Sequence, residues 1–470
     1  MTITHSDRRI CMFSKYVWCS LIFLGIGLAG CVPFSGNGVK ESDSSLSSER
    51  SSLIVFDETE IPSNGFNTED TRMENITLWN ALSLTLLKNP VLSAFSWELR
   101  AGEARIIQAG LYPNPELSVE MENFGGKREL NDFDSTETTF KISQLIELGD
   151  KRNKRKRLMA LESALVRWDY VTTRNHIFAQ VKRAFVNILI AQKRLSLIKE
   201  LICLDEQVLE TVSERVRAGK ASPVEKTKAE VLLASNRIRQ ENASNELDIA
   251  RQKLASYFGE KEVWFKCVTG DIDKIIPVPP IEQLTPELSK NPDIARWQTE
   301  LRKNQANIEM RKSRVIPDIT LDAGFRWFNE GNDNYGFVTG LTIPLPLFDR
   351  NQGSIQEAQF LLEKARKEML NAEVKLASKF IEAYKRLSLA YSGVNSLKEH
   401  ILPGAQDTFN ASNEGFKEGK ISYLQLLDAQ RILFDSEMQY LEAISSYHHA
   451  VIDMEQLITQ SLFKKNEYIQ

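Results

Sequence analysis

Cysteine and histidine are scarce in this chain, with 5 of each among 470 residues. Cys31, Cys203 and Cys267 remain after the N-terminal apolar segment, and an odd number without CxxC spacing argues against a disulfide framework and a zinc site. If Cys31 carries lipid, Cys203 and Cys267 could pair, but Cys203 falls in the middle of an expected helix, so we expect both to be free, buried thiols. The neighbours His448 and His449 point about 100° apart on a helix, so they cannot bind one metal ion as an i,i+4 pair would. We expect two core or surface histidines and no metal site.

Catalytic signatures are also missing. The chain contains no GxxxxGK[ST], GxSxG or HExxH motif, which argues against a P-loop enzyme, an α/β-type serine hydrolase and a zinc protease. With 59 basic and 63 acidic residues, it lacks the positive excess that is typical of nucleic-acid binding. These absences favour a protein that is not an enzyme, uses no cofactor and takes its energy from a partner.

Long hydrophobic runs are absent except near the N-terminus. The apolar stretch Tyr16–Cys31 is short for a membrane span, follows basic residues and ends in Leu-Ala-Gly-Cys, with Val32 next. This is the layout of a signal that ends in a lipobox, and Val32 in place of Asp resembles lipoproteins sorted to the outer membrane. Ordinary cleavage beside a chance match is the alternative. We predict a lipoprotein signal peptide at residues 1–30, lipidation of Cys31, and a polar, flexible tether at 31–75.

The chain repeats one pattern after about 200 residues. Lys88–Pro90 recurs as Lys290–Pro292, and Arg217–Ser222 recurs as Lys417–Ser422. A long-period duplication has to be recognised first because it decides the architecture. We predict two structural repeats followed by a short tail, at residues 76–270, 271–463 and 464–470.

Each repeat carries two short segments in which polar and apolar residues alternate, as they do along a strand with two unlike faces. Ile319, Leu321 and Phe325 fall on one face of their segment, and Leu341 and Ile343 share a face in the next. Strands of about ten residues cross a bilayer when tilted. We predict two β-hairpins in the wall of a membrane barrel, apolar outside and polar inside, at residues 115–148 and 317–347. A soluble, half-buried sheet would show the same alternation and is the alternative.

Four strands cannot close such a barrel, because about eight are needed before side chains fit inside. Open sheet edges are not tolerated in lipid. Copies of the chain must therefore share one barrel, to which two copies would supply eight strands and three copies twelve. The strand pattern alone leaves this choice open.

Helix breakers are missing from long parts of the chain. No proline or glycine occurs between Asp150 and Ala218, and apolar residues recur at three- and four-residue steps from Ala191 to Val216, interrupted only by Asp205. This spacing with charged flanks is typical of a coiled coil, with an ordinary helical bundle as the alternative. We predict long helices at residues 150–218, 222–258, 353–418 and 422–463, the third of them bent or broken near Gly393 and Pro403.

Each pair of long helices reverses at a glycine, Gly219 or Gly419, which permits a left-handed backbone past the helix end. Ser222 and Ser422 then occupy the expected N-cap position of the helix that follows each turn. Glu225 is placed to complete a capping box in the first copy, and Gln425 can do so in the second. Capping explains these turns fully, so a docking role would be an addition to it.

These features resemble the TolC-type outer-membrane factors, or outer-membrane efflux proteins, over about residues 78–459. The resemblance is carried by Lys88–Pro90, Tyr112–Pro115, Gly149–Arg152 and Pro344–Gly353, and within the family it is greatest to the CzcC- and CusC-like branch of heavy-metal pumps. It implies a fold that is mainly α with a small β part: long antiparallel coiled-coil helices and β-hairpins. It also implies a homotrimer with one twelve-stranded barrel in the outer membrane, a periplasmic α-helical tunnel and a small mixed belt.

The resemblance further implies partners and site residues. A periplasmic adaptor would meet the tips of the helical hairpins, and an inner-membrane pump of the RND or another type would supply the energy. The tip residues expected to contact the adaptor are Arg217, Gly219, Lys220, Ser222, Lys417, Gly419, Lys420 and Ser422. The positions expected at an aperture near the tip are Glu225, Gln425 and Asp428. Three copies of Asp428 around one axis would attract cations, although a lone acid near a helix N-terminus is also favoured by the helix dipole.

Together, residues and resemblance predict an outer-membrane exit duct of a tripartite efflux system that passively conducts substrates, with heavy-metal cations as the cargo by resemblance. A drug-efflux or type I secretion duct is the alternative within the family. A periplasmic coiled-coil scaffold lipoprotein without a channel is the alternative outside it. The strand faces distinguish the duct from the scaffold. A duct exposes the apolar face to lipid, whereas a scaffold buries it in its own core; the residues of that face are Leu321, Phe325, Leu341 and Ile343.

Overall fold

The computed structural model describes residues 74–124, 136–329, 334–459 and 462. The chain divides into two units, Met1–Phe66 and Asn67–Gln470, and every described residue lies in the second. The predicted signal peptide, the lipidation site Cys31, nearly all of the tether and the tail at 464–470 lie outside the described residues.

Among the described residues, the first repeat contains four helices and the two strands of a hairpin, in the order expected from the sequence, with a further short strand at each end. In chain order the elements are β1 (Asn75–Thr77), α3 (Leu78–Lys88), α4 (Pro90–Ala109), β2 (Glu116–Glu122), β3 (Glu137–Ile146), α5 (Lys151–Arg217), α6 (Pro223–Tyr257) and β4 (Cys267–Thr269).

The second repeat follows the same order with more interruptions. Its elements are α7 (Ile281–Leu284), a 3₁₀ turn η3 (Thr285–Lys290), α8 (Pro292–Ser313), β5 (Ile319–Phe328), β6 (Asn334–Thr342), α9 (Gln352–Ser396), a π-helical turn η4 (Leu397–Ile401), α10 (Leu402–Lys417) and α11 (Tyr423–Ile458). The π turn ends at Ile401, two residues before Pro403, which has no N–H to continue the helical ladder. The predicted fold class, mainly α with long helices and a small antiparallel sheet, is confirmed.

The Lys-Asn-Pro motifs fix the start of a helix in each repeat. The side-chain oxygens of Asn89 and Asn291 each accept a hydrogen bond from the amide two residues later, at 2.9 and 2.8 Å, and the following proline occupies the first turn. Their side-chain nitrogens donate to the carbonyls of Tyr257 and Leu457, at 2.9 and 2.8 Å. Each motif therefore ties the start of α4 or α8 to the last residues of α6 or α11.

The two hairpins form one antiparallel sheet in the order β2-β3-β5-β6. β3 pairs with β5 from Glu137 opposite Phe328 to Ile146 opposite Ile319. The sequence predicts both hairpins but not this pairing between them. The cause lies in the helices, because α5 follows β3, α8 precedes β5, and α5 packs against α8.

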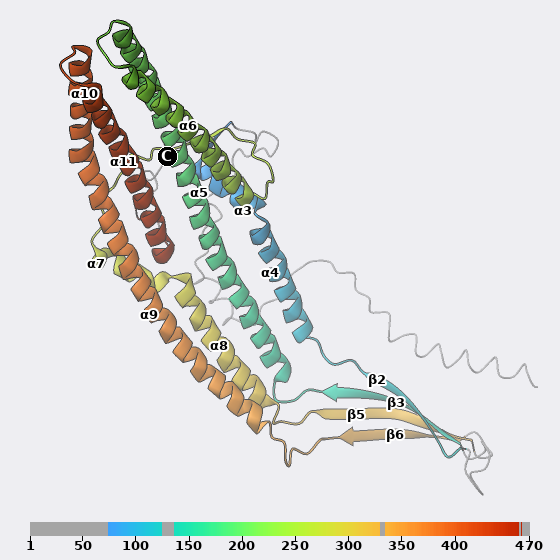
Figure 1. Ribbon diagram of the computed structural model, residues 1–470. Coiled ribbons are helices and arrows are strands. Elements are labelled where there is room, and N and C mark those ends of the chain that lie inside the picture. The colour runs from blue at the N-terminus through green and yellow to red at the C-terminus, as the bar shows by residue number, and fades with distance from the viewer. Residues whose placement is uncertain (1–73, 125–135, 330–333, 460–461, 463–470) are drawn as a thin grey trace, which may run out of the picture. The chain divides into compact units, whose positions relative to one another are not determined.

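The helices next to the sheet keep the order of the strands that they adjoin. α4 packs on α5, α5 on α8, and α8 on α9, while α6 and α11 both pack on α5 and α10 packs on α11 (Figure 1). β1 and β4 form a separate parallel pair, with Ile76 opposite Val268. It joins two segments that lie about 190 residues apart in the chain.

The main core lies where the middle of α5, the second half of α11 and the β1–β4 pair meet. Phe185, Ile188 and Val451 are fully buried there, and burying one such side chain contributes about 1.5–3 kcal/mol. The seam predicted on α5 is confirmed, since Ala191, Ile198, Ile202 and Val212 are buried and Leu195, Leu209 and Val216 are partly buried. No helix in the described ranges has both the length and the apolar character needed to cross a membrane.

Candidate functional site

One face of the four-stranded sheet is polar, and its charges pair across strands. The guanidinium of Arg326 lies 2.7 Å from a carboxylate oxygen of Glu137 and 3.3 Å from one of Glu122. The hydroxyl of Ser143 donates to Asp322 at 2.5 Å. These side chains come from β2, β3 and β5, so the polar face is continuous across the hairpin junction.

The opposite face is apolar and exposed. Leu321 stands opposite Leu341, and Phe325 opposite both Phe337 and Phe140, with the rings of Phe140 and Phe325 stacked at 5.1 Å. The Phe337 side chain is 85% exposed, although it is among the largest apolar side chains on the face. The face is therefore not covered by the chain's own core, which is the arrangement expected of a duct and not of a scaffold.

The sheet continues into the helices through two tight junctions that carry motifs noted in the sequence. Asp150 and Asn351 adopt left-handed backbones, with φ of 60° and 56°, as the residues that directly precede α5 and α9. Lys151 then forms an ion pair with Asp318 at 2.6 Å, which joins the start of α5 to the entry of β5. Gly149 also has positive φ and lies so close to Ile316 that a Cβ would come within 2.9 Å of its side chain.

At the far end of the helices, two turns reverse the chain at positive-φ glycines, with φ of 69° at Gly219 and 76° at Gly419. The eight residues predicted to contact an adaptor all lie in these turns and are exposed: Arg217, Gly219, Lys220, Ser222, Lys417, Gly419, Lys420 and Ser422. The structure therefore gathers each set of four at one helical tip (Figure 1).

The helix caps next to these turns differ between the repeats. The Ser422 hydroxyl and the Gln425 side chain form the full capping box, with the Gln425 oxygen accepting from the Ser422 amide at 3.0 Å. In the first repeat the Ser222 hydroxyl accepts a hydrogen bond from the backbone amide of Val224, at 3.3 Å, and not from the backbone amide of Glu225. The capping box predicted for Glu225 is therefore wrong, because the Ser222 hydroxyl turns to the amide one residue earlier.

The three positions expected at an aperture have different surroundings. Asp428 is exposed on α11, and Glu225 is half-buried in the first turn of α6. The side chain of Gln425 is engaged in the cap of its own helix. Glu225 lies near Tyr423, whose pKa is raised to about 12 by burial first, and then by the charges of Asp205 and Glu225.

A buried polar cluster, made of Asp205, Asn236 and Gln430, joins three helices. Asp205 is 3% exposed, and its two carboxylate oxygens accept hydrogen bonds from Asn236 at 2.6 Å and from Gln430 at 2.8 Å. Burial raises the pKa of Asp205, while both hydrogen bonds and the charge of Arg239 act in the other direction. The sequence signal for this Asp205 cluster is the acid that interrupts an apolar seam, but its partners could not be found from one chain.

No group of three or more His, Cys, Asp or Glu side chains in the described part of the chain is placed to hold a metal ion. His448 is fully buried, and its Nε2 donates to the carbonyl of Ile272 at 2.8 Å. Burial lowers the pKa of His448 and of His449, so both favour the neutral form. His448 is therefore a core histidine, one of the two roles expected for the pair.

Cys203 and Cys267 are both free, as predicted. The expectation that both are buried is wrong, because Cys203 is exposed on α5 and Cys267 is half-buried in β4. Cys203 follows Ile202, which belongs to the buried seam. Because successive helical residues point about 100° apart, Cys203 points away from that seam and is exposed. The thiol of Cys267 donates to the side-chain oxygen of Asn75 at 2.8 Å.

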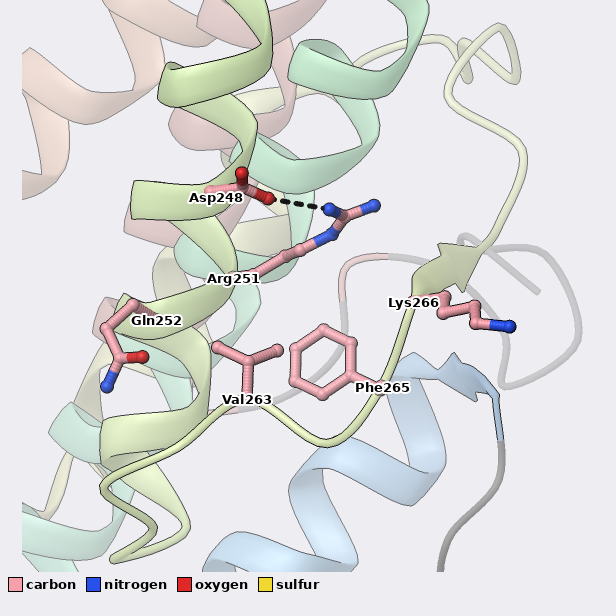
Figure 2. Close-up of a pocket in the computed structure, with 6 residues that line it drawn as sticks. All are labelled: Asp248, Arg251, Gln252, Val263, Phe265 and Lys266. Carbon is pink, nitrogen blue, oxygen red and sulfur yellow. Dashed lines mark hydrogen bonds and ion pairs between the residues drawn. The ribbon is translucent and has the colours of Figure 1, made fainter.

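A recess of about 450 Å³ lies between α6 and the segment that leads into β4 (Figure 2). Its two cationic side chains are already paired, Arg251 with Asp248 at 2.8 Å and Lys266 with Glu74 at 2.6 Å. The wall contributed by Phe265 is apolar and buried. The recess offers no unpaired charge for an ionic ligand, and we assign it no function.

The sequence model of the family described as "Outer membrane efflux protein" matches residues 81–260 and 285–460. Both structural repeats are therefore matched, including the long helices, the hairpins and the tips.

Two of the individual proteins described next match more than three quarters of the chain, and one matches about half. The cobalt-zinc-cadmium resistance protein CzcC of Cupriavidus metallidurans is 36% identical over 384 residues, which cover 82% of this chain and 90% of that protein. The probable outer membrane lipoprotein SilC of Salmonella typhimurium is 26% identical over 276 residues, or 55% of this chain and 56% of SilC. A solved structure of CusC has a TM-score of 0.66 at 18% identity and covers 81% of this chain and 91% of CusC, a likeness that shows the fold.

Proposed function

We propose that three copies of this chain form one duct for heavy-metal cations. The proposal starts from the family: the chain belongs to the outer membrane efflux proteins and is an outer-membrane efflux channel, not an enzyme. In this proposal the energy comes from an inner-membrane pump of the RND or another type. A periplasmic adaptor links that pump to the tips of the helices, where it contacts the two turns Arg217–Ser222 and Lys417–Ser422. Glu225, Gln425 and Asp428 line the aperture near these tips.

The observation that carries the proposal is the open, two-faced sheet. In the described residues β2 and β6 each pair on one side only, so the sheet has two free edges. Its apolar face is exposed and its polar face holds the ion pairs of Arg326. Free edges cannot stay unpaired in lipid, and neighbouring copies can satisfy them by pairing β6 of one with β2 of the next.

Exposed apolar stripes on the helices support the same arrangement. On α6, Val224, Val231 and Ile238 recur at seven-residue steps, and on α9, Val374 and Ile381 do so. α6 packs on α5, whereas α9 packs on α8 and α11, so the two stripes belong to helices that lie on opposite sides of α5 (Figure 1). A ring of copies would bring such stripes together and bury them.

Metal cations are the proposed cargo because the relative with 36% identity is named as a cobalt-zinc-cadmium resistance protein. Deleting the gene in its own strain should lower tolerance of Co²⁺, Zn²⁺ or Cd²⁺, and restoring the gene should recover it. Loss of antibiotic tolerance instead of metal tolerance would favour a drug-efflux duct. Loss of a secreted protein would favour a type I secretion duct.

Lipidation of Cys31 is proposed as the anchor in the outer membrane. Its support is the Leu-Ala-Gly-Cys sequence at the end of an apolar segment, and SilC is named as a probable outer membrane lipoprotein. Mass spectrometry of the N-terminal peptide should find a lipid-modified Cys31. A Cys31→Ser variant should lose that mass and its membrane anchor, whereas an unmodified Cys31 would remove the anchor from the proposal.

Conductance tests the channel directly. Purified full-length protein in planar bilayers should give discrete conductance steps. A folded oligomer that gives no steps would contradict the duct and favour a scaffold.

A further inference from the structure

A dense group of positive charges lies where the sheet meets the helices. Two segments at the β3–α5 and α8–β5 junctions, residues 147–157 and 309–318, together hold nine Lys or Arg and four Asp or Glu. The chain as a whole has a net charge of −4. Positive charge is therefore concentrated at this edge of the sheet, in contrast to the rest of the molecule.

The first two turns of α5 carry cations where a helix disfavours them. Six of the seven residues 151–157 are Lys or Arg, and the first turn of α5 has no acidic residue. The N-terminal end of a helix has a partial positive charge, which favours acidic side chains and opposes basic ones. The run therefore gains nothing from its own helix, and groups outside α5 have to compensate it.

The acidic residues of the two segments compensate only part of the run. Each of these four acids has a partner within 3.3 Å: Asp318 with Lys151, Glu147 with Arg155, Glu309 with Arg157, and Asp150 with Asn153. Lys156 and Lys312 are exposed, and neither pairs with a carboxylate in the described part of the chain. These two lysines are therefore available to an anion from outside the chain.

Lys151 and Arg155 point to the polar side of the sheet. Their partners, Asp318 and Glu147, extend β5 and β3 by one residue. Alternation at period two places both acids on the face that carries Asp322. In the proposed duct this face lines the interior.

Neighbouring helices cover two other sides of α5. Tyr170 meets α4, with its ring 6.1 Å from that of Phe95, and Trp168 meets α8 by donating to Thr299 at 3.0 Å. At about 100° per residue, Tyr170 and Trp168 point roughly 160° apart around the helix axis. α5 therefore keeps one uncovered face on each side of the row of α4, α5 and α8 (Figure 1).

Lys156 and Arg157 occupy the face of α5 opposite to Lys151 and Arg155. At about 100° per residue, the midpoint of the first pair lies about 170° from the midpoint of the second. Lys312 lies three residues after the α8 acid that pairs with Arg157, and residues three apart share a helix face. Lys156, Arg157 and Lys312 therefore form one patch on the same side as the apolar face of the sheet, which we call the lipid-side patch.

The lipid-side patch lies at the level of lipid headgroups if the sheet crosses a bilayer. The headgroup layer is about 5–7 Å thick on each side of the hydrocarbon core. At 1.5 Å per residue, Lys156 lies about 8 Å along α5 from its first residue. Tyr112, at the same junction, is 71% exposed and holds the guanidinium of Arg152 at 4.0 Å from its ring centroid. Tyrosine is enriched at this level of membrane proteins.

Other copies of the chain leave the lipid-side patch uncovered in the proposed duct. There β6 of one copy pairs with β2 of the next, so the helices that adjoin these strands, α9 and α4, lie at the subunit boundary. α5 and α8 are the inner two helices of the row. The patch therefore faces the bilayer surface, where basic side chains attract anionic lipids.

We propose that the lipid-side patch binds the phosphate groups of anionic phospholipids in the periplasmic leaflet of the outer membrane. The proposal rests on the proposed duct, whose sheet crosses that membrane. The acyl chains of such a lipid contact the apolar face of the sheet, and its phosphate contacts Lys156, Arg157 and Lys312. Bound lipid then compensates the positive charge at the start of α5 and holds the duct at one depth in the membrane.

Native mass spectrometry of the full-length oligomer in a neutral detergent tests the proposal. The protein is titrated with dioleoylphosphatidylglycerol or with dioleoylphosphatidylethanolamine, which have the same acyl chains and differ in headgroup charge. The wild type should retain phosphatidylglycerol in preference. A variant with Lys156→Gln and Lys312→Gln should bind phosphatidylglycerol roughly fivefold more weakly for each charge removed, with phosphatidylethanolamine unchanged.

Arg167→Gln is the matched control. Arg167 is exposed on α5 and points within about 20° of the direction of Lys156, but it lies about 16 Å farther along the helix. It should leave the binding of phosphatidylglycerol unchanged. A variant with Lys156→Arg and Lys312→Arg keeps both charges and should bind as the wild type does. If the double glutamine variant does not assemble, each single variant should still show about a fivefold loss.

Three results would overturn the proposal: equal retention of the two lipids by the wild type, unchanged phosphatidylglycerol binding in the double glutamine variant, or an equal loss in Arg167→Gln. Excess glycerol 3-phosphate, which has a phosphate but no acyl chains, should leave bound phosphatidylglycerol in place. Its displacement of the lipid would show a site for soluble anions and would overturn the lipid assignment.

Conductance of the same preparations separates this proposal from the proposed function. Discrete conductance steps together with no preference for phosphatidylglycerol refute the lipid site alone. A folded oligomer without conductance refutes the duct, and the lipid titration then decides on the lipid site by itself.

Discussion

The carboxylate of Asp205 accepts a hydrogen bond from the side-chain amide of Gln430 at 2.8 Å. Asp205 lies on α5 and Gln430 on α11, so this bond joins the two halves of the duplicated chain. Asn236 of α6 donates to the second oxygen at 2.6 Å. No ion pair among the described residues includes Asp205, and burial raises its pKa.

Asp205→Asn should change the pH dependence of stability. The folded chain holds the proton of Asp205 more tightly than the unfolded chain, whose pKa is near 3.8, so stability falls as pH rises through the raised pKa. The groups that face Asp205 are Glu206 on α5, Arg239 on α6 and Tyr423 on α11. Asparagine does not ionise, so the fall in melting temperature as pH rises above about 4, measured by circular dichroism, should become smaller in this variant.

Glu210→Gln is the control for this effect, because Glu210 is exposed on the same helix and is not among the charges that shift the pKa of Asp205. It should leave the pH slope as in the wild type. Asp205→Ala should destabilise by about 1–3 kcal/mol, since it leaves two buried amide donors without an acceptor. An Asp205→Asn slope identical to the wild type would show that Asp205 does not titrate in this range.

His448→Gln should act in the opposite direction on the pH profile. Burial lowers the pKa of His448, so the unfolded chain, with a pKa near 6.5, takes up the proton first and stability falls as pH drops below 6.5. Glutamine can still donate to the Ile272 carbonyl but does not titrate. The fall in melting temperature from about pH 7.5 to about pH 5 should become smaller. Part of it should remain, since burial also lowers the pKa of His449. An unchanged acid sensitivity would contradict this.

Asp428→Asn should lower the preference of the channel for cations over anions. Asp428 is exposed near the tip, and a ring of such carboxylates raises the local concentration of cations. We expect the permeability ratio, taken from reversal potentials in planar bilayers, to fall by a factor of about two or more. Asp435→Asn, farther along the same helix and paired with Arg431, should leave the ratio unchanged. An unchanged ratio in Asp428→Asn would remove Asp428 from the aperture.

Phe337→Lys should prevent stable insertion into the outer membrane. Phe337 lies on the exposed apolar face, and a lysine facing lipid costs about 2–4 kcal/mol at the bilayer midplane. The adjacent residue on the same strand, Val338, points to the polar face, so Val338→Lys should still assemble. The amount of folded oligomer in the outer-membrane fraction measures both variants. Equal assembly of the two would contradict the assignment of the faces.

Local features could be predicted from the sequence because their causes lie within a few residues. The turn glycines Gly219 and Gly419, the serine caps and the alternation along β5 each follow from backbone conformation or from a fixed period. The duplication then gave the order of the elements. For the same reason, the seam through Ile198 and Val212 could be predicted before its partners were known.

Contacts between distant residues could not be predicted in the same way. The pairing of β3 with β5 depends on the packing of α5 on α8, and the Asp205 cluster needs partners 31 and 225 positions away. Arg215 shows no unusual spacing in the sequence, so its contact with the ring of Phe416 in the other repeat could not be predicted either. The exposure of Cys203 depends on which faces of α5 are covered by other helices.

The central claim is that the four strands of one chain form an incomplete wall that other copies complete. Native mass spectrometry of the detergent-solubilised protein tests it most directly. For a chain of 53.5 kDa, before processing and lipidation, the account predicts a species of three copies that dissociates only when the protein unfolds. A folded monomer that stays soluble after the detergent is removed would contradict it.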